Sequence, residues 1–555
     1  MSPAVIYVDM GRNWRLFSAC LLLHLVLFLE HESQLNPLGL LIKSVKRFHK
    51  ELIILGIIIL LALCVRVWGI SYDLPYIYHP DEPDMVRIIQ NMFKTGDPNP
   101  HFFSYPSLFI YVNALAYVPY FIFGKIIGIF ATRNDIFAPI TLVMGVTKTQ
   151  LSSSILLGRF ISVILGVGTV GLTFAAGRKL SGKLIVGVLA ALMVAISPTN
   201  VWHSRFITPD TLVVFFVVAS FVAIVFVYQQ GKTRHYIIAG ICIGLTAASK
   251  YNGGLIVLSL LLAHFFRYGR TALKERNLYL SLVMCGVGFL VATPYALLDY
   301  KNFFNAVISA GSVYSSSHAG MEGNTLKWYI EYLWSTGSII LILGVLEIFR
   351  GIYTRSKEII LLSLFPVLYF LFISSFFIRN DRTILPLTPF LILLAASFLG
   401  FLLEKARELL SKEWRRVSIA AVACFSMVTF IQPASVTISQ TKQLTTVNSR
   451  ETARIWIQNN LPPGSKIAIE AYTPFIDPTR FAVYGFFKMI EHKPEWYIEQ
   501  SFDYLIFGQN MYGRFYLDPK RYSVEISQYD DLFERFQLVK MFTDGGYEVR
   551  IYKVK

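Results

Sequence analysis

Apolar runs recur from about Glu51 to about Ile431, and they limit what this chain can fold into more than any other feature. Most are close to the ~20 residues that a helix needs to cross a hydrocarbon core of ~30 Å. Hydrophobic residues make up 54% of the 555 residues and charged residues only 15%, so a water-soluble fold would leave much apolar surface exposed. The sequence therefore predicts a polytopic α-helical membrane protein.

The excess of basic residues is explained by the membrane. The chain has 51 Lys and Arg against 35 Asp and Glu, a formal net charge of +16. In a soluble protein this would suggest nucleic acid, but here the basic residues cluster in short loops between apolar runs, where they set orientation. No nucleic acid partner is expected. The five cysteines lie in apolar stretches without CxxC spacing, so neither a disulfide framework nor a zinc site is predicted.

The basic loops also decide how one ambiguous segment is placed. Residues 106–130 could be a second span, but counting them as one would put five basic loops outside, against the positive-inside bias. These loops are "GRKLSGK", "QQGKTRHY", "RYGRTALKERN", "RGIYTRSK" and "EKARELLSKEWRR". Pro106 and Pro119 also fit an interfacial or re-entrant helix better than a straight span. We therefore expect about eleven spans, surrounded by membrane lipids. They are predicted at residues 52–70, 154–176, 184–202, 211–228, 236–249, 254–267, 279–298, 332–349, 358–378, 384–403 and 417–432.

This topology gives a simple domain organisation. Residues 1–50 form an N-terminal extension, expected to be cytoplasmic or interfacial, with a signal-like stretch or a start-site artefact as alternatives. Residues 51–432 form the transmembrane domain, and its long loops 71–153 and 299–331 lie outside. Residues 433–555 combine an amphipathic helix with alternating strand patterns, which predicts a small extracytoplasmic α/β domain. The expected location is a prokaryotic plasma membrane, in the cell envelope.

The same topology gathers polar residues at the outer ends of the spans. The candidate carboxylates are Asp81 and Glu82 after the first span and Asp210 after the third. The candidate substrate-binding residues are Arg205, Lys250, Tyr251, His318, Arg379 and Arg382. Each has a structural explanation, since the acids could begin helices and the basic side chains could reach lipid headgroups. These explanations do not say why all of them share one face.

Sugar transfer from a polyprenyl-phosphate donor would use this set of residues. The lipid tail lies in the bilayer and its phosphate at the outer interface, where Lys and Arg can bind it. Phosphate is a good leaving group, so the main requirement is one carboxylate that takes a proton from the acceptor hydroxyl. Asp81 is the predicted base, and its neighbours hold the geometry. Neither a metal ligand nor a cofactor is predicted, and a divalent cation stays an open alternative.

The order of these motifs resembles the GT-C glycosyltransferases. "PDE" after the first span, followed by "M", "GD" and "PH" before an aromatic segment with proline, resembles their first external loop, and residues 158–212 resemble their next two spans. The resemblance covers about residues 50–435 and is strongest to the protein O-mannosyltransferases and the lipid A aminoarabinose transferases. It implies amphipathic helices in the first loop, activity without an essential metal, and catalytic roles for Asp81, Glu82 and Asp210.

One position departs from both families. The aminoarabinose enzymes carry Lys-Pro at the start of the interfacial segment and the mannosyltransferases His-Pro-Pro, whereas this chain has Tyr105-Pro106. Tyr105 remains a candidate substrate-binding residue, but the phosphate contact is expected from Lys250, Arg379 or Arg382. Whether the acceptor is a protein, a lipid or a glycan therefore stays open.

The main hypothesis is a mannosyltransferase-like membrane enzyme. It would move a monosaccharide from a polyprenyl-phosphate donor to an acceptor hydroxyl on the extracytoplasmic side, by single displacement with an Asp general base. A polytopic transporter or lipid flippase is the alternative, and a membrane scaffold that presents the tail is a third. A transporter should place charges or broken helices near the middle of the bilayer, whereas the charges here lie at the ends of the spans.

Overall fold

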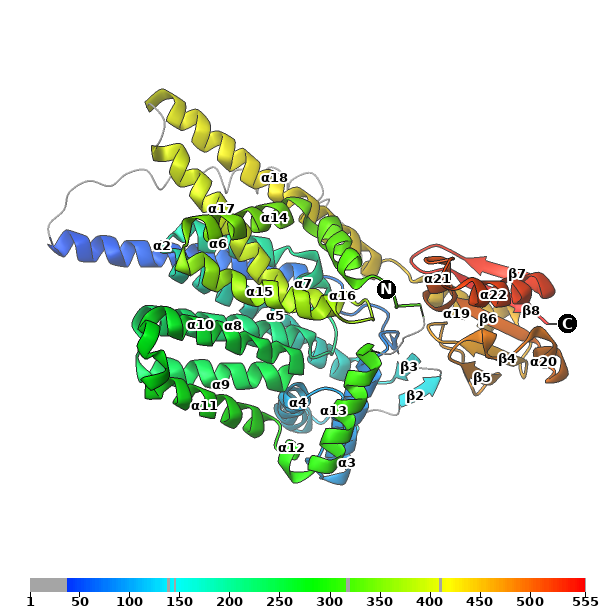
Figure 1. Cartoon of the computed structure of the whole chain (residues 1–555). Helices are drawn as coiled ribbons and strands as arrows, with labels where there is room; N and C mark the ends of the chain where they lie inside the picture. The colour runs from blue at the N-terminus through cyan, green and yellow to red at the C-terminus, as the bar shows by residue number, and fades with distance from the viewer. Residues whose placement is uncertain (1–36, 137–139, 144–145, 316–319, 409–411, 555) are drawn as a thin grey trace.

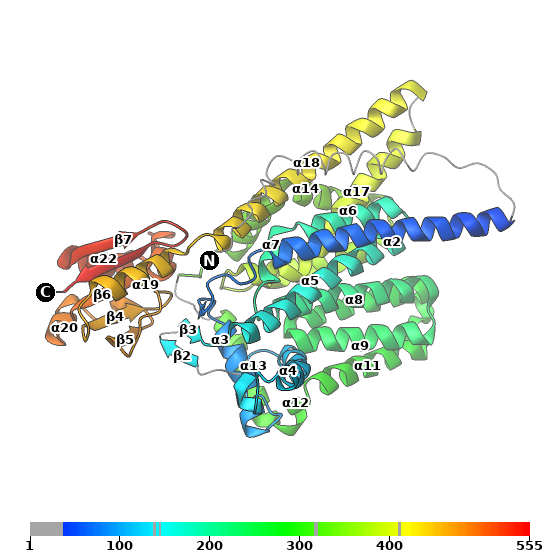
Figure 2. The ribbon, with the colours of Figure 1, turned by 180° about the vertical axis from the view of Figure 1, so that it is seen from behind.

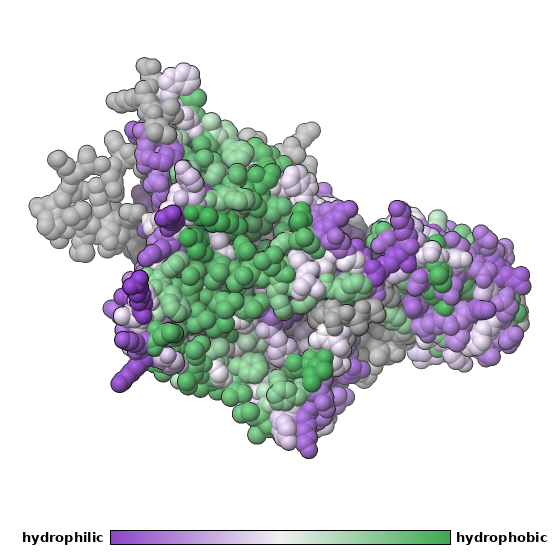
Figure 3. Space-filling model, viewed as in Figure 1, coloured by the Kyte–Doolittle hydropathy of each residue, from purple (hydrophilic) through white to green (hydrophobic). Residues whose placement is uncertain are grey.

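The computed structural model describes residues 37–136, 140–143, 146–315, 320–408 and 412–554. A bundle of apolar helices makes up most of the chain, and the C-terminal residues form a separate sheet domain beyond one end of it (Figure 1). Apolar residues cover the bundle in a broad band, while hydrophilic residues cover the sheet domain and the opposite end of the bundle (Figure 3). This is the surface of a protein that spans a membrane.

Each of the eleven predicted spans coincides with a helix in the described ranges. These helices are α2 (Pro37–Val67), α5 (Ser152–Ser181), α6 (Leu184–Ala195), α8 (Asp210–Gln230), α9 (Thr233–Ser249), α10 (Val257–Tyr268), α11 (Arg276–Ala292), α14 (Thr325–Thr354), α15 (Lys357–Ser374), α17 (Thr388–Glu408) and α18 (Lys412–Thr445). By length and composition alone, seven described helices could cross a membrane, or up to eight if the bent pair Tyr251–Lys274 and Arg276–Ala292 is one span. The lower number arises because α6 and α10 have 12 residues each and α9 and α11 have 17 each, while α2 is not among the seven.

The helix α4 (Leu108–Ile126) is one of those seven, but it does not run along the bundle. Figure 1 shows it nearly end-on, whereas α8, α9 and α11 run across the page. Its side chains Leu115, Phe123 and Ile126 are 71%, 62% and 76% exposed, as suits a helix whose apolar side lies in the membrane interface. With α3 (Glu82–Thr95) and α13 (Tyr300–Ser315), it forms the helical cover expected at this end of the bundle.

Two features at this end differ from the prediction. The first loop also contains a small antiparallel sheet of β1 (Tyr76–Ile77), β3 (Val146–Thr149) and β2 (Ile140–Val143), in that order. These strands are too short to give a clear alternating pattern. The second difference concerns α18, which was expected to end near residue 432. Pro433 lies inside this helix, which continues to Thr445. α18 thus reaches from the bundle toward the sheet domain, as seen from behind in Figure 2.

The C-terminal domain confirms the predicted small α/β fold. Its five strands are β4 (Lys466–Glu470), β5 (Ala482–Phe486), β6 (Tyr504–Gly508), β7 (Gln537–Phe542) and β8 (Val549–Lys553). They lie in the order β5-β4-β6-β8-β7, where β4 is parallel to β5 and β6, and β8 is antiparallel to β6 and β7. The helices α19 (Ser449–Asn460), α20 (Pro494–Glu499), α21 (Gln509–Tyr516) and α22 (Ser523–Arg535) accompany the sheet.

The sheet domain takes part of the first loop into its core. Ile467 and Ile469 of β4 belong to the cluster that includes α19, and Ala468 belongs to the cluster on the other face with α22, as the pleat of a strand requires. Tyr76 and Tyr78 of the first loop belong to the α19 cluster. The segment that leads into α3 is therefore packed into the C-terminal domain, although the two lie near opposite ends of the sequence.

The two ends of the bundle should lie on opposite sides of the membrane. We expect Lys274→Cys, in the basic loop before α11, to be protected from an impermeant thiol reagent in intact cells, and Glu495→Cys, on the exposed side of α20, to be labelled. Both variants would be made without the five native cysteines. Labelling of Lys274→Cys with protection of Glu495→Cys would reverse the orientation.

Candidate active site

Asp81 lies directly before α3, and its carboxylate is available to solvent. It occupies the N-cap position, yet its side chain accepts no hydrogen bond from a described N–H group of the helix, so capping does not explain it. Instead the carboxylate is paired with the Nη1 of Arg382, which belongs to the short helix α16 (Asp381–Ile384). The side chains of Asp81 and Arg382 are 25% and 24% exposed. The Asp81 N–H donates to Nδ1 of His79 (3.2 Å), which fixes the backbone.

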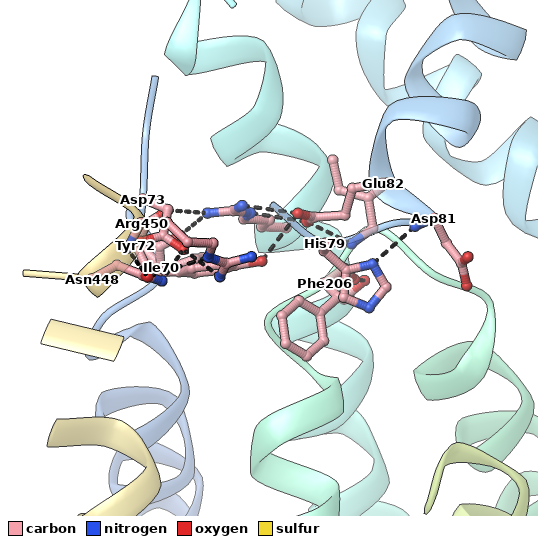
Figure 4. Close-up of polar contacts among 12 residues, drawn as sticks. Ile70, Tyr72, Asp73, His79, Asp81, Glu82, Phe206, Asn448 and Arg450 are labelled. Atoms are coloured by element: carbon pink, nitrogen blue, oxygen red, sulfur yellow. Dashed lines mark hydrogen bonds and ion pairs between the residues drawn. The ribbon is translucent and has the colours of Figure 1, made fainter. Parts of the chain in front are cut away.

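Glu82, the next residue, is fully buried. Arg159 of α5 donates to it twice, from Nε to Oε1 and from Nη2 to Oε2, both at 2.9 Å. The Tyr72 hydroxyl donates to Oε2 and the Ile207 N–H to Oε1, each at 3.0 Å. Burial alone would raise the pKa of Glu82, but Arg159 and the other donors lower it overall. Figure 4 shows Glu82 within this network and the Asp81 carboxylate pointing away from it.

Arg159 extends the network to the end of the first span. Its Nη1 donates to the carbonyls of Ile70 (2.8 Å) and Tyr72 (3.1 Å), and its guanidinium lies 3.8 Å from the centre of the Tyr72 ring. The Glu82–Arg159 pair therefore joins the chain after α2, the start of α3, and α5. Arg159 lies near the N-terminus of α5, and its ion-pair partner is an acid of the first loop.

Asp210 and Lys250 form a second buried pair. Asp210 is the first residue of α8, and Lys250 follows the last residue of α9. Lys250 Nζ donates to Asp210 Oδ1 at 2.8 Å, and the two side chains are only 8% and 2% exposed. Lys250 therefore does not extend to lipid headgroups. The pair joins two spans that adjoin the segment with Asp81.

A fourth acid and base meet beside Arg382. His203 Nε2, at the end of α7 (Pro198–His203), lies 3.3 Å from Oδ2 of Asp381. His203 is not among the residues predicted from the sequence, although it precedes "SRFITPD" directly. Asp381 and Arg382 are consecutive, so α16 contributes to two of the four pairs. Together the pairs place acids from three separate segments at the end of the bundle that adjoins the C-terminal domain.

Two predicted arginines have backbone partners. Arg205 is fully buried, and its Nη2 donates to the carbonyl of Val65 (2.7 Å) and to Oγ1 of Thr441 (2.8 Å). It thus binds the C-terminal carbonyls of α2, a position that favours a cation, and holds α18 against them. Arg379 donates from Nε to the Met321 carbonyl (3.3 Å) and holds the end of the second external loop.

The two remaining described candidates contact phenylalanines of the first loop. The Tyr251 hydroxyl donates to the Phe103 carbonyl (2.9 Å), and the Tyr105 ring lies 5.9 Å from that of Phe102. His318 lies outside the described residues. Within the described ranges, no group of three or more His, Cys, Asp or Glu side chains could hold a metal ion.

Comparison with known proteins gives a partial match in sequence. Residues 140–312 match the family model of dolichyl-phosphate-mannose-protein mannosyltransferase. Dolichyl-phosphate-mannose–protein mannosyltransferase 1 of Candida albicans is 27% identical over 215 residues, which are 35% of this chain and 24% of the relative. The chain therefore matches about a quarter of the length of that protein.

Comparison with solved structures covers nearly the whole chain. The apo structure of ArnT from Cupriavidus metallidurans matches with a TM-score of 0.52 and 14% identity, over 89% of this chain and 97% of that one. The archaeal oligosaccharyltransferase AglB from Archaeoglobus fulgidus matches with a TM-score of 0.53 and 12% identity, over 92% and 74%. At these identities the likeness shows the fold. The chain therefore has the fold of the GT-C membrane glycosyltransferases, as its motifs predicted, and part of it matches the mannosyltransferase family in sequence.

Proposed function

We propose that the chain transfers a sugar from a polyprenyl-phosphate donor to an acceptor hydroxyl, with Asp81 as the general base. One observation carries this proposal. Of the two neighbouring acids, Glu82 is buried and accepts four hydrogen bonds. Asp81 is one-quarter exposed beside Arg382 at the end of the bundle. A base must reach its substrate, and an arginine at the membrane surface is a suitable ligand for a lipid phosphate.

The similar proteins support this class of donor. The family model that matches residues 140–312 is named for dolichyl-phosphate-mannose. ArnT from Cupriavidus metallidurans, solved with undecaprenyl phosphate, has a TM-score of 0.51 against this chain. Dolichyl and undecaprenyl phosphates share a polyprenyl chain and a phosphate headgroup, so a polyprenyl-phosphate-linked sugar is the donor that we propose here.

The proposed reaction is a single displacement. The acceptor oxygen attacks the anomeric carbon as the bond from that carbon to the donor phosphate breaks, and Asp81 takes the proton from the acceptor hydroxyl. Polyprenyl phosphate leaves with the bonding electrons. In the structure the Asp81 carboxylate is paired with the Arg382 guanidinium. A donor phosphate would compete for the Arg382 guanidinium and so free the carboxylate when the donor is bound.

The other acids then have positioning roles. Glu82 fixes the residue next to Asp81 through Arg159, and Asp210 holds Lys250 between two spans. Both carboxylates are buried and paired with a cation, so neither offers the open position that a base needs. We place the reaction on the extracytoplasmic side, because the basic loops lie at the opposite end of the bundle.

Removing the basicity of Asp81 should abolish transfer without unfolding the protein. We expect Asp81→Asn to lower the rate of sugar transfer from radiolabelled polyprenyl-phosphate sugars by about 10²–10⁴-fold, the typical contribution of a general base. Asp84→Asn is the matched control, because Asp84 is exposed on the same helix and pairs only with Arg87 among its described neighbours. A well-folded Asp81→Asn protein with near-normal transfer would show that the base is elsewhere.

Removing the charge of Glu82 should mainly affect stability. Glu82→Gln leaves the buried Arg159 guanidinium without its counter-ion, a change that typically costs about 3–5 kcal/mol. We expect a lower unfolding midpoint for the purified protein, whereas Asp84→Asn, which breaks an exposed pair worth about 1 kcal/mol or less, should leave it nearly unchanged. Normal stability combined with lost transfer would assign Glu82 a direct catalytic role instead.

Neutralising Arg382 should weaken donor binding. A hydrogen bond to a charged group contributes about 1.5–3 kcal/mol, so Arg382→Gln should raise the donor dissociation constant by about 10-fold or more. Arg87→Gln, at an exposed position on α3, is the control. Unchanged donor affinity in Arg382→Gln would mean that this arginine serves only to hold Asp81.

A further inference from the structure

A cleft of about 170 Å³ lies where the bundle meets the C-terminal domain. The first loop, the segment between α7 and α8, the end of α18 and the sheet domain all contribute to its walls. Aromatic rings line it from both sides. They include Tyr78, Trp202 and Phe206 from the first half of the chain and Tyr472 and Tyr547 from the C-terminal domain. None of the residues of the four ion pairs of the candidate active site lines the cleft.

The charges in this cleft balance each other. Asn448 Nδ2 donates to Asp73 Oδ2 at 3.3 Å, and Arg450 Nη2 lies 3.8 Å from the same oxygen. The Arg450 guanidinium also lies 4.0 Å from the centre of the Tyr78 ring. Figure 4 shows Asp73, Asn448 and Arg450 together at one side of the network. Because Asp73 and Arg450 offset each other, the cleft favours a neutral ligand over a phosphate or another ion.

Polar groups with unused hydrogen-bonding capacity also line the cleft. The side-chain amides of Gln443 and Asn510 line it, and neither has a hydrogen-bond partner among the described residues. The wall beside them depends on Gly545, which has a φ of +86°, and where a Cβ would lie 1.9 Å from the Val447 carbonyl oxygen. Only glycine allows the turn to pack this closely against the chain before α19.

We propose that this cleft binds one neutral sugar ring of a glycan acceptor, an inference that rests on the proposed glycosyltransferase function. An apolar cavity of about 150 Å³ binds a benzene ring, and this cleft of about 170 Å³ is slightly larger. The C–H groups of a sugar ring carry partial positive charge and suit the negative faces of the aromatic rings. Its hydroxyl groups match the amides of Gln443 and Asn510. Aromatic walls with a few polar groups are the usual composition of a small-ligand site.

The position of the cleft indicates which sugar ring it holds. Pro80 lines it, and Asp81 is the next residue. The His79 ring packs against Phe206, with 4.4 Å between the ring centres, and both rings line the cleft. In Figure 4 the Asp81 carboxylate lies on the other side of His79 from Tyr72 and Asp73. The bound ring would therefore be a neighbour of the reacting ring, and the acceptor would contain at least two sugar units.

The test measures binding of defined neutral sugars to the full-length protein in detergent. The probes are methyl α-mannopyranoside, methyl β-glucopyranoside, α-1,2-mannobiose and cellobiose, detected by saturation-transfer NMR. We expect at least one probe to bind saturably, and Tyr547→Ala and Asn510→Ala each to weaken it by about fivefold or more, as for the loss of an important contact in a binding site. Tyr484→Ala is the matched control, since Tyr484 and Tyr547 are 47% and 45% exposed and Tyr484 lies on β5 away from the cleft.

Donor consumption in the same preparation separates this inference from the proposed function. If the donor is consumed but no probe binds, or binding is the same in both cleft variants and the wild type, the cleft is not a sugar site. Saturable binding of a serine- and threonine-containing peptide that is lost in Tyr547→Ala, with no sugar binding, would likewise overturn it in favour of a protein acceptor. Sugar binding lost in both cleft variants, without donor consumption under any condition, would support the cleft and contradict the glycosyltransferase proposal.

Discussion

The buried ion pair between Glu82 and Arg159 is the interaction on which the rest of the candidate site depends. A charge buried without a partner is very unfavourable, so the pair is tolerated only because every oxygen and most N–H groups in it are engaged. Its contacts join the end of α2, the start of α3, α5 and the turn before α8. The residue next to Glu82 is therefore held at a fixed place on the end of the bundle.

This arrangement gives two adjacent acids different tasks. Glu82 is turned inward and anchors the chain, while Asp81 is turned outward toward Arg382 and solvent. Chemically similar carboxylates acquire different roles through their surroundings. The C-terminal domain supports the same segment from the other side, because Tyr76 and Tyr78 pack in its core. We infer that this domain helps to position Asp81 in addition to forming the cleft.

Much of the fold follows from local patterns in the sequence. Apolar length placed the spans, the basic loops separated the interfacial segment 106–130 from them, and strand alternation identified the C-terminal domain. The pairing of charges could not be predicted, since Asp81 and Arg382 are 301 residues apart and hydropathy does not say which helix ends meet. For the same reason His203 was missed, and Arg205 was grouped with the substrate-binding residues although it binds the end of α2. The predicted span 417–432 ends before Pro433, but α18 continues past this proline to Thr445.

The most direct test of this account is a cryo-electron microscopy structure of the full chain in a lipid nanodisc with a non-hydrolysable polyprenyl-phosphate sugar. The account predicts the phosphate at Arg382, the anomeric carbon facing an Asp81 carboxylate released from that arginine, and Glu82 still bound to Arg159. A donor phosphate bound at the basic end of the bundle, or an Asp81 carboxylate turned away from the sugar, would contradict it.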